Sequence, residues 1–241
     1  MTDSVQQGPL AGRVAYVTGS SRGIGAATAQ ALAAAGAHVL LSGRSASELE
    51  GVEDAIHHAG GTATIAPFDL AEGDSIARLA SAVAERWDRL DILVLNAAIL
   101  PQLTPVAQIE VKAFNQALTT NLLAPQALLA AFDPLLRRSP AGRVIALTSS
   151  VATAPRAYWG AYAATKAALE VLVDTYGQEV ERISGIRVAV LDPGATRTRM
   201  RARAFPGEDP QGVKPPEVVA ARIAALLTDD FPNHHRERVD G

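Results

Sequence analysis

The stretch Thr18-Gly19-Ser20-Ser21-Arg22-Gly23-Ile24-Gly25 decides the fold. It follows the apolar run Arg13 to Thr18 and leads directly into an Ala-rich helical pattern. Three glycines let the backbone turn tightly and approach a ligand, and the N-terminus of a helix presents free N–H groups and a positive dipole end to a pyrophosphate. The alternative is an ordinary Gly-rich turn, but strand, loop and helix follow one another here in the order of a phosphate-binding loop.

Outward from this loop, short apolar runs alternate with long helical patterns along the whole chain. This alternation is typical of βαβ units, in which helices cover both faces of a parallel sheet. The predicted strands are Arg13 to Thr18, His38 to Ser42, Thr62 to Phe68, Ile92 to Leu95, Arg143 to Thr148 and Arg187 to Leu191, with a weak last strand near Arg238. The predicted helices are Gly23 to Ala35, Ser45 to Ala59, Glu72 to Trp87, Val111 to Arg137, Gly160 to Arg182 and Pro216 to Thr228. We therefore predict an α/β, Rossmann-type, doubly wound fold with a mostly parallel sheet of six or seven strands, and ligands bound beyond the C-terminal strand ends.

The composition limits the domain organisation and the class of protein. The chain has 241 residues, 48% of them hydrophobic, a formal net charge of −3 and no cysteine. This length suits one domain over residues 1–241, and we expect residues 1–10 to form a polar lead-in. Without cysteine there is no disulfide, thiolate nucleophile or Cys-ligated zinc, which fits a reducing, cytoplasmic compartment. The charge argues against nucleic-acid binding, and no apolar stretch reaches the roughly 18 residues of a membrane span.

The GxxxGxG spacing after a threonine resembles the short-chain dehydrogenase/reductase family. Two further segments resemble the family in order. Asp69-Leu70 is similar to the pair that contacts adenine, and Asn96-Ala97-Ala98 is similar to the Asn-Ala-Gly loop, with Ala98 in place of the glycine. The resemblance implies a nicotinamide dinucleotide, and the residues that would bind it in these segments are Gly19, Ser21, Arg22, Gly23, Ile24, Gly25, Asp69, Leu70, Asn96 and Ala98.

The end of the second predicted strand bears on the choice of cofactor. About 20 residues past the loop, an NAD-binding enzyme usually carries an acid for the ribose 2′-hydroxyl. Gly43 stands there, and Arg44 follows it. A guanidinium can hold a 2′-phosphate by paired hydrogen bonds, and Arg22 is placed to help from the loop. We predict NADP(H) over NAD(H); the alternative is two solvated arginines.

Tyr162 and Lys166 lie four residues apart at the start of a predicted helix, so both side chains share one face. An ammonium beside a phenol favours the phenolate, and we expect it to lower the tyrosine pKa from about 10 toward working pH. Ser150 precedes Tyr162 at the end of the fifth predicted strand. By the family resemblance, Tyr162 donates a proton to a substrate carbonyl, Lys166 tunes Tyr162 and holds the nicotinamide ribose, and Ser150 orients the substrate oxygen.

Asn121 completes the set of catalytic candidates. Pro125, four residues on, has no N–H, so the Asn121 carbonyl loses its helical donor and the helix must kink or bind something else there. A solvated or packing asparagine is the alternative. In the family, an Asn at this point holds a water that links the lysine to solvent. We therefore predict a proton path from solvent through this water, Lys166 and the ribose to Tyr162.

The segment after the sixth predicted strand resembles the Pro-Gly motif of the family, with Pro193, Gly194, Thr196 and Thr198 as cofactor candidates. The family threonine binds the nicotinamide carboxamide, and Thr198 is our first choice for it, before Thr196. Residues 199–215 are expected to form a mobile lid over the substrate. Around its start the arginines Arg197, Arg199, Arg201 and Arg203 alternate, either as a solvated patch or as a site for an anionic substrate or an acidic carrier. The apolar pocket is predicted from Leu100, Pro101, Gln102, Tyr158, Trp159 and Met200.

These features favour an NADP(H)-dependent ketone or 3-oxoacyl reductase that also runs as a secondary-alcohol dehydrogenase. Alternatives are a dehydrogenase of a sugar, polyol, steroid or aromatic alcohol, and a catalytically silent NADP-binding sensor. The expected partner is a small carbonyl or alcohol substrate, free or carrier-bound. The C-terminal segment departs from the family pattern. Because family tetramers commonly use that edge strand, a homodimer is an alternative to the usual homotetramer. His234 and His235 would point to opposite faces of a strand, so we expect no metal site.

Overall fold

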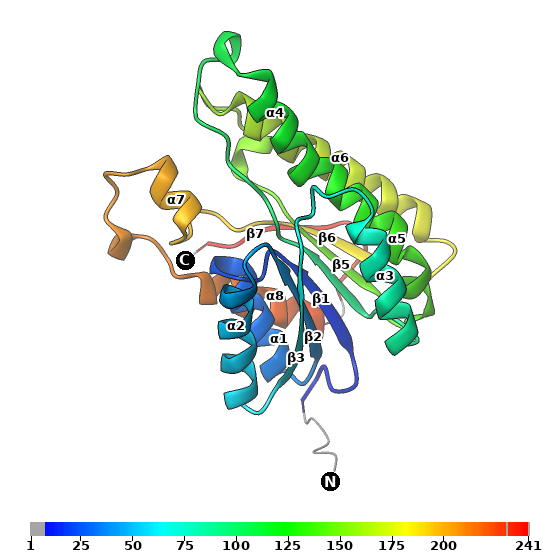
Figure 1. Cartoon of the computed structure of the whole chain (residues 1–241). Coiled ribbons are helices and arrows are strands. Elements are labelled where there is room, and N and C mark those ends of the chain that lie inside the picture. Colours follow the sequence, from blue (N-terminus) through cyan, green and yellow to red (C-terminus); the bar gives the residue numbers. More distant parts are fainter. Residues whose placement is uncertain (1–7, 230, 241) are drawn as a thin grey trace.

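The computed structural model describes residues 8–229 and 231–240, which form one parallel sheet with helices on both faces (Figure 1). The strands are β1 (Val14–Thr18), β2 (His38–Gly43), β3 (Thr62–Pro67), β4 (Ile92–Leu95), β5 (Arg143–Leu147), β6 (Arg187–Asp192) and β7 (His235–Arg238). Their order in the sheet is β3-β2-β1-β4-β5-β6-β7, and every neighbouring pair is parallel. The predicted doubly wound fold is confirmed, and its strand order reverses between β1 and β4.

Helices pack on the two faces of this sheet. They are α1 (Gly23–Ala34), α2 (Ala46–His58), α3 (Ser75–Arg86), α4 (Val111–Leu118), α5 (Ala124–Arg138), α6 (Gly160–Val180), α7 (Arg199–Ala204) and α8 (Pro216–Thr228). Helices α1, α2 and α8 cover one face, and α3, α5 and α6 cover the other (Figure 1). Within the described ranges, no helix combines the length and the apolarity that crossing a membrane requires.

The strands are buried on both faces, which explains their continuous apolar sequences. Along β1, Ala15 and Val17 pack toward α1 and α8, whereas Val14 and Tyr16 pack toward α3 and α5. The Tyr16 ring lies 5.2 Å from that of Phe132 in α5, and its hydroxyl meets the Ser42 hydroxyl at 2.9 Å. Close packing on both sides makes the sheet a rigid base for the loops at its C-terminal edge.

Some predicted boundaries need correction. The helix predicted over Glu72 to Trp87 begins only at Ser75, after turns in which the backbone N–H groups of Glu72 and Ser75 donate to the carbonyls of Asp69 and Glu72. The helix predicted over Val111 to Arg137 is interrupted by a π-helical turn at Thr119–Leu123, after which α5 begins. Pro125 is the reason, since a residue without an N–H forces the local hydrogen bonds to rearrange. Residues 1–7 of the predicted lead-in lie outside the described residues. Leu10, at its end, is fully buried and donates its N–H to Ala35, so it belongs to the core.

Candidate active site

The phosphate-binding loop lies between β1 and α1, at the reversal point of the sheet. Gly19 and Gly23 adopt φ angles of +63° and +57°, which suit glycine, and α1 begins at Gly23. A Cβ atom on Gly25 would lie 2.3 Å from the Gly19 carbonyl oxygen, so only glycine lets α1 pack this close to the loop. The predicted order of strand, glycine loop and helix N-terminus is therefore present in three dimensions.

Asn96 follows β4 and braces this loop from the other half of the sheet. Its side-chain amide donates to the carbonyl oxygens of Thr18 at 2.7 Å and Gly19 at 3.1 Å. The Thr18 hydroxyl in turn accepts the N–H groups of Asn96 and Ala97, each at 3.0 Å, and donates to the Val94 carbonyl. The amide of Asn96 thus positions the loop, and direct contacts of Asn96 and Ala98 with a cofactor stay predictions.

Arg44 follows β2 on the surface and lines a groove of about 660 Å³ together with Phe68, Asp69 and Arg78. Its guanidinium makes no hydrogen bond or ion pair with any described residue. Asp69 faces this groove as predicted, and its Oδ1 accepts the Ala71 N–H at 3.0 Å. Leu70 packs against the core under α3 and α5 and is not part of the groove lining. The groove therefore offers an available cation and an aromatic wall beside the phosphate loop.

Arg22, the second predicted 2′-phosphate ligand, is engaged with a carboxylate that sequence reasoning missed. Glu48 in α2 accepts from Arg22 at 3.4 Å and from Arg199 in α7 at 3.0 Å. Burial alone would raise the pKa of Glu48, but hydrogen bonds from Ser21 and Arg199 and the charge of Arg22 together lower it. An anion that takes Arg22 must therefore compete with Glu48.

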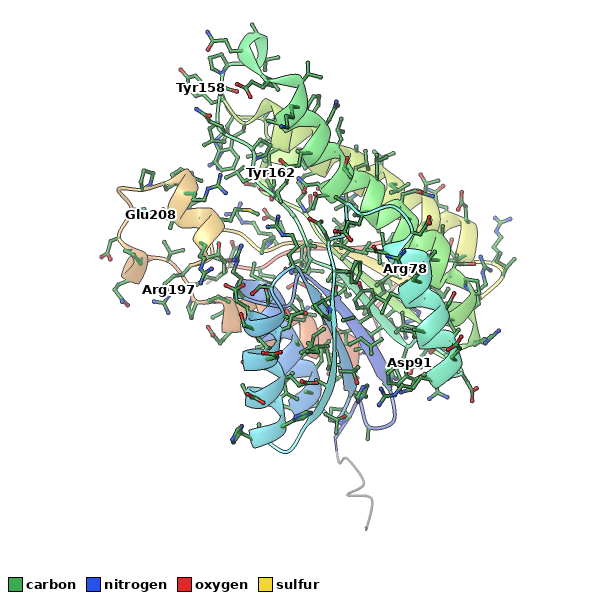
Figure 2. All side chains as sticks on the ribbon, viewed as in Figure 1. Arg78, Asp91, Tyr158, Tyr162, Arg197 and Glu208 are labelled. Carbon is green, nitrogen blue, oxygen red and sulfur yellow. The ribbon has the colours of Figure 1, made fainter. Side chains whose placement is uncertain are left out.

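Tyr162 and Lys166 lie on one face of α6, beyond the C-terminal end of β5. Both side chains are buried, with 7% and 2% of their surfaces exposed. The Lys166 ammonium lies 5.8 Å from the centre of the Tyr162 ring and donates to the Leu147 carbonyl oxygen at 2.7 Å. The predicted pair is therefore brought together beyond the C-terminal ends of the strands; Figure 2 labels Tyr162 at this place.

The electrostatics of this pair differ from the sequence-based expectation. Burial raises the pKa of the Tyr162 phenol above its ordinary value, and the negative charge of Asp192 raises it further. Burial lowers the pKa of Lys166 to about 8, against an opposing effect of Glu170. The expected lowering of the Tyr162 pKa is therefore wrong for this structure, because the ammonium turns to the Leu147 carbonyl and burial dominates.

Asn121 lies in the π-helical turn and is fully buried. Its Nδ2 donates to the Ile99 carbonyl at 2.9 Å and to the Thr165 hydroxyl at 3.0 Å, and its Oδ1 accepts the Ile99 N–H at 2.8 Å. Thr165 passes the connection on by donating to the Tyr162 carbonyl at 2.8 Å. Asn121 therefore ties the loop after β4 to the turn of α6 that carries Tyr162. Sequence reasoning missed Thr165.

The remaining predicted residues also line this edge. Ser150 begins a 3-10 turn (Ser150–Ala152) shortly after β5, and the buried Val151 of this turn belongs to the same apolar cluster as Tyr162. Beyond β6, Gly194 adopts a φ of +61°, and the Thr196 hydroxyl donates to the Pro193 carbonyl at 2.9 Å. Thr198 caps α7, and its methyl group would lie 3.4 Å from a Cβ on Gly23.

Comparison with known proteins agrees with this geometry. The sequence profile of the short chain dehydrogenases matches residues 13–209. The chain belongs to the short-chain dehydrogenase family. The oxidoreductase YciK of Escherichia coli K12 is 36% identical over 232 residues, which cover 93% of this chain and 90% of YciK.

Solved structures of short-chain dehydrogenases have the same fold as this chain. A short-chain dehydrogenase from Pseudomonas syringae has a TM-score of 0.93 and 38% identity, and the match covers 96% of each chain. One from Shigella flexneri 2a, solved in complex with NADP, has a TM-score of 0.92 and 34% identity over 97% of this chain and 99% of that one. The predicted family and enzyme class are confirmed.

This short-chain dehydrogenase has an apolar wall beside Tyr162. Leu100, Val151 and Tyr162 form a small buried cluster, against which the partly buried Trp159 and Met200 pack. The Trp159 ring stands edge-on to Tyr162, with centroids 6.1 Å apart. Of the predicted pocket residues, Gln102 is exposed and Tyr158, 58% exposed at a φ of +72°, lies farther from the sheet than Tyr162 (Figure 2).

The segment 199–215 closes this wall through contacts that the sequence did not reveal. Phe205 lies 5.8 Å from the Trp159 ring, and the Arg201 guanidinium stacks 3.7 Å above Phe205. Glu208 accepts two hydrogen bonds from Arg201, at 2.5 and 2.7 Å. Of the four alternating arginines of the short-chain dehydrogenase, Arg199 and Arg201 are therefore ion-paired. The hydrophobic and charged residues of 199–215 gave no local pattern that pointed to these partners.

Proposed function

We propose that this chain is an NADP(H)-dependent oxidoreductase that transfers a hydride between the nicotinamide and a ketone or secondary alcohol. The buried pair Tyr162 and Lys166, placed between the phosphate loop and an apolar wall, is the observation that carries this proposal. We also propose a small-molecule substrate, a cytoplasmic location because the chain has no cysteine, and, from the family resemblance, a homodimer or homotetramer.

The residues present fit a bound NADP(H). Gly25 lets the N-terminus of α1 pack directly against the glycine loop, and Gly43 stands where a carboxylate would repel a 2′-phosphate. Arg44 supplies a cation without a partner among the described residues. When bound, the nicotinamide supplies or accepts the hydride. The NADP complex of the Shigella flexneri relative supports this choice over NAD(H).

Tyr162 acts as the general acid in the reduction. Because burial keeps its phenol protonated, the hydroxyl can donate a proton to the carbonyl oxygen as the carbonyl carbon gains the hydride. The phenolate that remains is stabilised by the Lys166 ammonium, which moves from the Leu147 carbonyl toward it. Ser150 orients the substrate oxygen. Asn121 holds the turn of Tyr162 in place, and we propose that water beside Asn121 connects Lys166 with solvent, so that the phenol recovers its proton.

The substrate we propose is a ketone with an apolar portion, which would pack against Leu100, Trp159 and Met200. A 3-oxoacyl thioester is the finer candidate. We propose that its carrier-bound form would contact exposed arginines. Arg197, which donates to Gln211 at 3.4 Å, and Arg203 are exposed and form no ion pair with a described residue. A carbonyl panel of cyclohexanone, phenanthrenequinone, a 3-ketosteroid and acetoacetyl-CoA, followed at the NADPH absorbance, distinguishes these classes.

The decisive experiment replaces Tyr162 by Phe. Tyr162→Phe should abolish turnover of the fastest ketone in the panel while NADPH still quenches the protein fluorescence. Tyr176→Phe is the matched control, because Tyr176 lies on the same helix but donates to Asp133 at 2.8 Å on the other side. Retained turnover in Tyr162→Phe would refute the role of Tyr162. NADPH binding by the wild type without turnover of any ketone would instead favour a sensor.

A further inference from the structure

Glu170 is a buried carboxylate on the catalytic helix that the proposed mechanism does not use. It lies four residues, one helical turn, beyond Lys166 in α6, and only 7% of it is exposed. Its Oε1 accepts the Thr148 hydroxyl at 2.5 Å, and its Oε2 accepts an Arg236 N–H at 2.7 Å. A buried charge is costly unless it is paired, so this residue is held by a complete set of partners.

These contacts join the end of β5 to α6 at two successive turns. Lys166 donates to the carbonyl of Leu147, and Glu170 accepts from the side chain of the next residue, Thr148. The chain continues from there to Ser150. Glu170 therefore fixes the short stretch of backbone that offers Lys166 its acceptor and leads to the predicted substrate-orienting serine.

The second partner of Glu170 comes from the far end of the chain. Arg236 belongs to β7, the edge strand next to β6, and it reaches α6 to contact both Glu170 and Asp174. Arg236 therefore connects the C-terminal segment, which departs from the family pattern, to α6 by two ion pairs. The guanidinium is partly exposed, whereas the Glu170 carboxylate is not.

We propose that Glu170 is a positioning residue for Lys166, and that Arg236 sets how strongly the Glu170 charge acts on the ammonium. The proposal rests on the proposed function, in which Lys166 acts as a cation beside Tyr162. Glu170 holds the ammonium in its charged form at the end of β5, and Arg236 partly neutralises Glu170. The strand β7 thereby adjusts the catalytic lysine without touching it.

Among the groups that surround Lys166, Glu170 is the one whose charge acts on the lysine ammonium. On α6, the neighbours are Tyr162 and Glu170, and of these only Glu170 contributes a charge that raises the pKa of Lys166 against burial. From β5 come the neutral groups of Leu147 and Thr148. From the end of β6, the charge of Asp192 acts on Tyr162. From the π-helical turn comes the neutral Asn121, through Thr165.

The test is the titration of Lys166 in two variants with opposite expected signs. Glu170→Gln keeps an acceptor for Thr148 but removes the charge, so the Lys166 pKa should fall by about one unit, at the lower end of the effect of a charged neighbour. Arg236→Gln leaves Glu170 unneutralised, so the Lys166 pKa should rise by about half a unit. The chain has only three lysines, so ¹³C-lysine NMR resolves each of them, and Lys166→Arg assigns the signal.

Glu237→Gln is the matched control, because it breaks a β7 contact with Arg222 of α8 at 2.6 Å but leaves Arg236 in place. Its Lys166 titration should equal that of the wild type. Shifts in the same direction in Glu170→Gln and Arg236→Gln, or no shift in either, would overturn the proposal. If Glu170→Gln does not fold, Arg236→Gln alone decides by the sign of its shift.

The same variants separate this proposal from the proposed function. The NMR titration needs no turnover, so it stands even if the ketone panel fails. With an active enzyme, the high-pH limb of kcat/KM for ketone reduction should move to lower pH in Glu170→Gln and to higher pH in Arg236→Gln. A structural role alone would lower the amplitude of both profiles and leave their midpoints in place.

Discussion

Replacement of Arg44 by Asp should reverse part of the cofactor preference. Arg44 lies exposed at the rim of the groove beside the phosphate loop and has no partner among the described residues, whereas Arg22 is engaged with Glu48. Arg44 is therefore the cation that a 2′-phosphate can take without breaking an existing ion pair. We expect the ratio of kcat/KM for NADPH to that for NADH to depend mainly on this residue.

The size of the effect follows from charge and exposure. A phosphate monoester carries about −1.5 to −2 charges, and two unit charges 4 Å apart interact by about 1 kcal/mol in water. Arg44 is exposed, so this solvent value applies, and Arg44→Asp changes the side-chain charge by two units. The interaction between this side chain and the 2′-phosphate should become less favourable by about 3 kcal/mol. The ratio of kcat/KM for NADPH to that for NADH should therefore fall about 100-fold.

The assay compares kcat/KM for both cofactors on one ketone at two ionic strengths. The loss should shrink at high salt, because exposed charges are screened. Arg138→Asp makes the same change of charge at the far end of the sheet, where Arg138 donates to the Asp88 carbonyl, and should leave the ratio unchanged. An unchanged ratio in Arg44→Asp would refute the assignment of the 2′-phosphate to this arginine.

Three further outcomes follow from the site. Glu48→Gln frees Arg22 and Arg199, so NADPH should bind a few-fold more tightly in calorimetry. Glu50→Gln, a change at an exposed neighbour, should leave the affinity unchanged. Weaker binding in Glu48→Gln would contradict the competition between Glu48 and a phosphate. Asn121→Leu leaves the backbone N–H and C=O of Ile99 without partners. It should therefore lower the free energy of unfolding by about 3 kcal/mol in urea titrations, with Asn115→Leu as the exposed control. For ketone reduction, kcat/KM should be level below pH 8 and fall above it, as the Lys166 ammonium is lost; a profile level to pH 10 would contradict this.

The elements that the sequence predicted well are those whose signal is local. The phosphate loop, the position of Arg44 and the spacing of Tyr162 and Lys166 each depend on a few consecutive residues with fixed chemical needs. The alternation of apolar runs and helical patterns then sets the parallel sheet, because each strand is buried on both faces. Such features survive without knowledge of distant contacts.

The features that sequence reasoning missed depend on residues that meet only in the folded chain. Glu48 and Arg199 are 151 positions apart, so no window of sequence pairs them. The acceptor of Lys166 is a backbone carbonyl on another element. Burial of the Tyr162 phenol raises the pKa of that group, which is opposite to the expected direction. Pro125 predicted an interruption of its helix, but the form of the interruption, a π-helical turn, depends on how Asn121 packs.

The bracing of the phosphate loop by Asn96 also has a consequence for folding. The loop belongs to the first βαβ half, but the amide that fixes its Thr18 and Gly19 carbonyls arrives with β4, across the reversal of strand order. A chain that has folded only its first three strands lacks this brace and so lacks a finished nucleotide site. Nucleotide binding therefore selects the complete sheet, and by mass action it stabilises the whole domain rather than the half that carries the glycines.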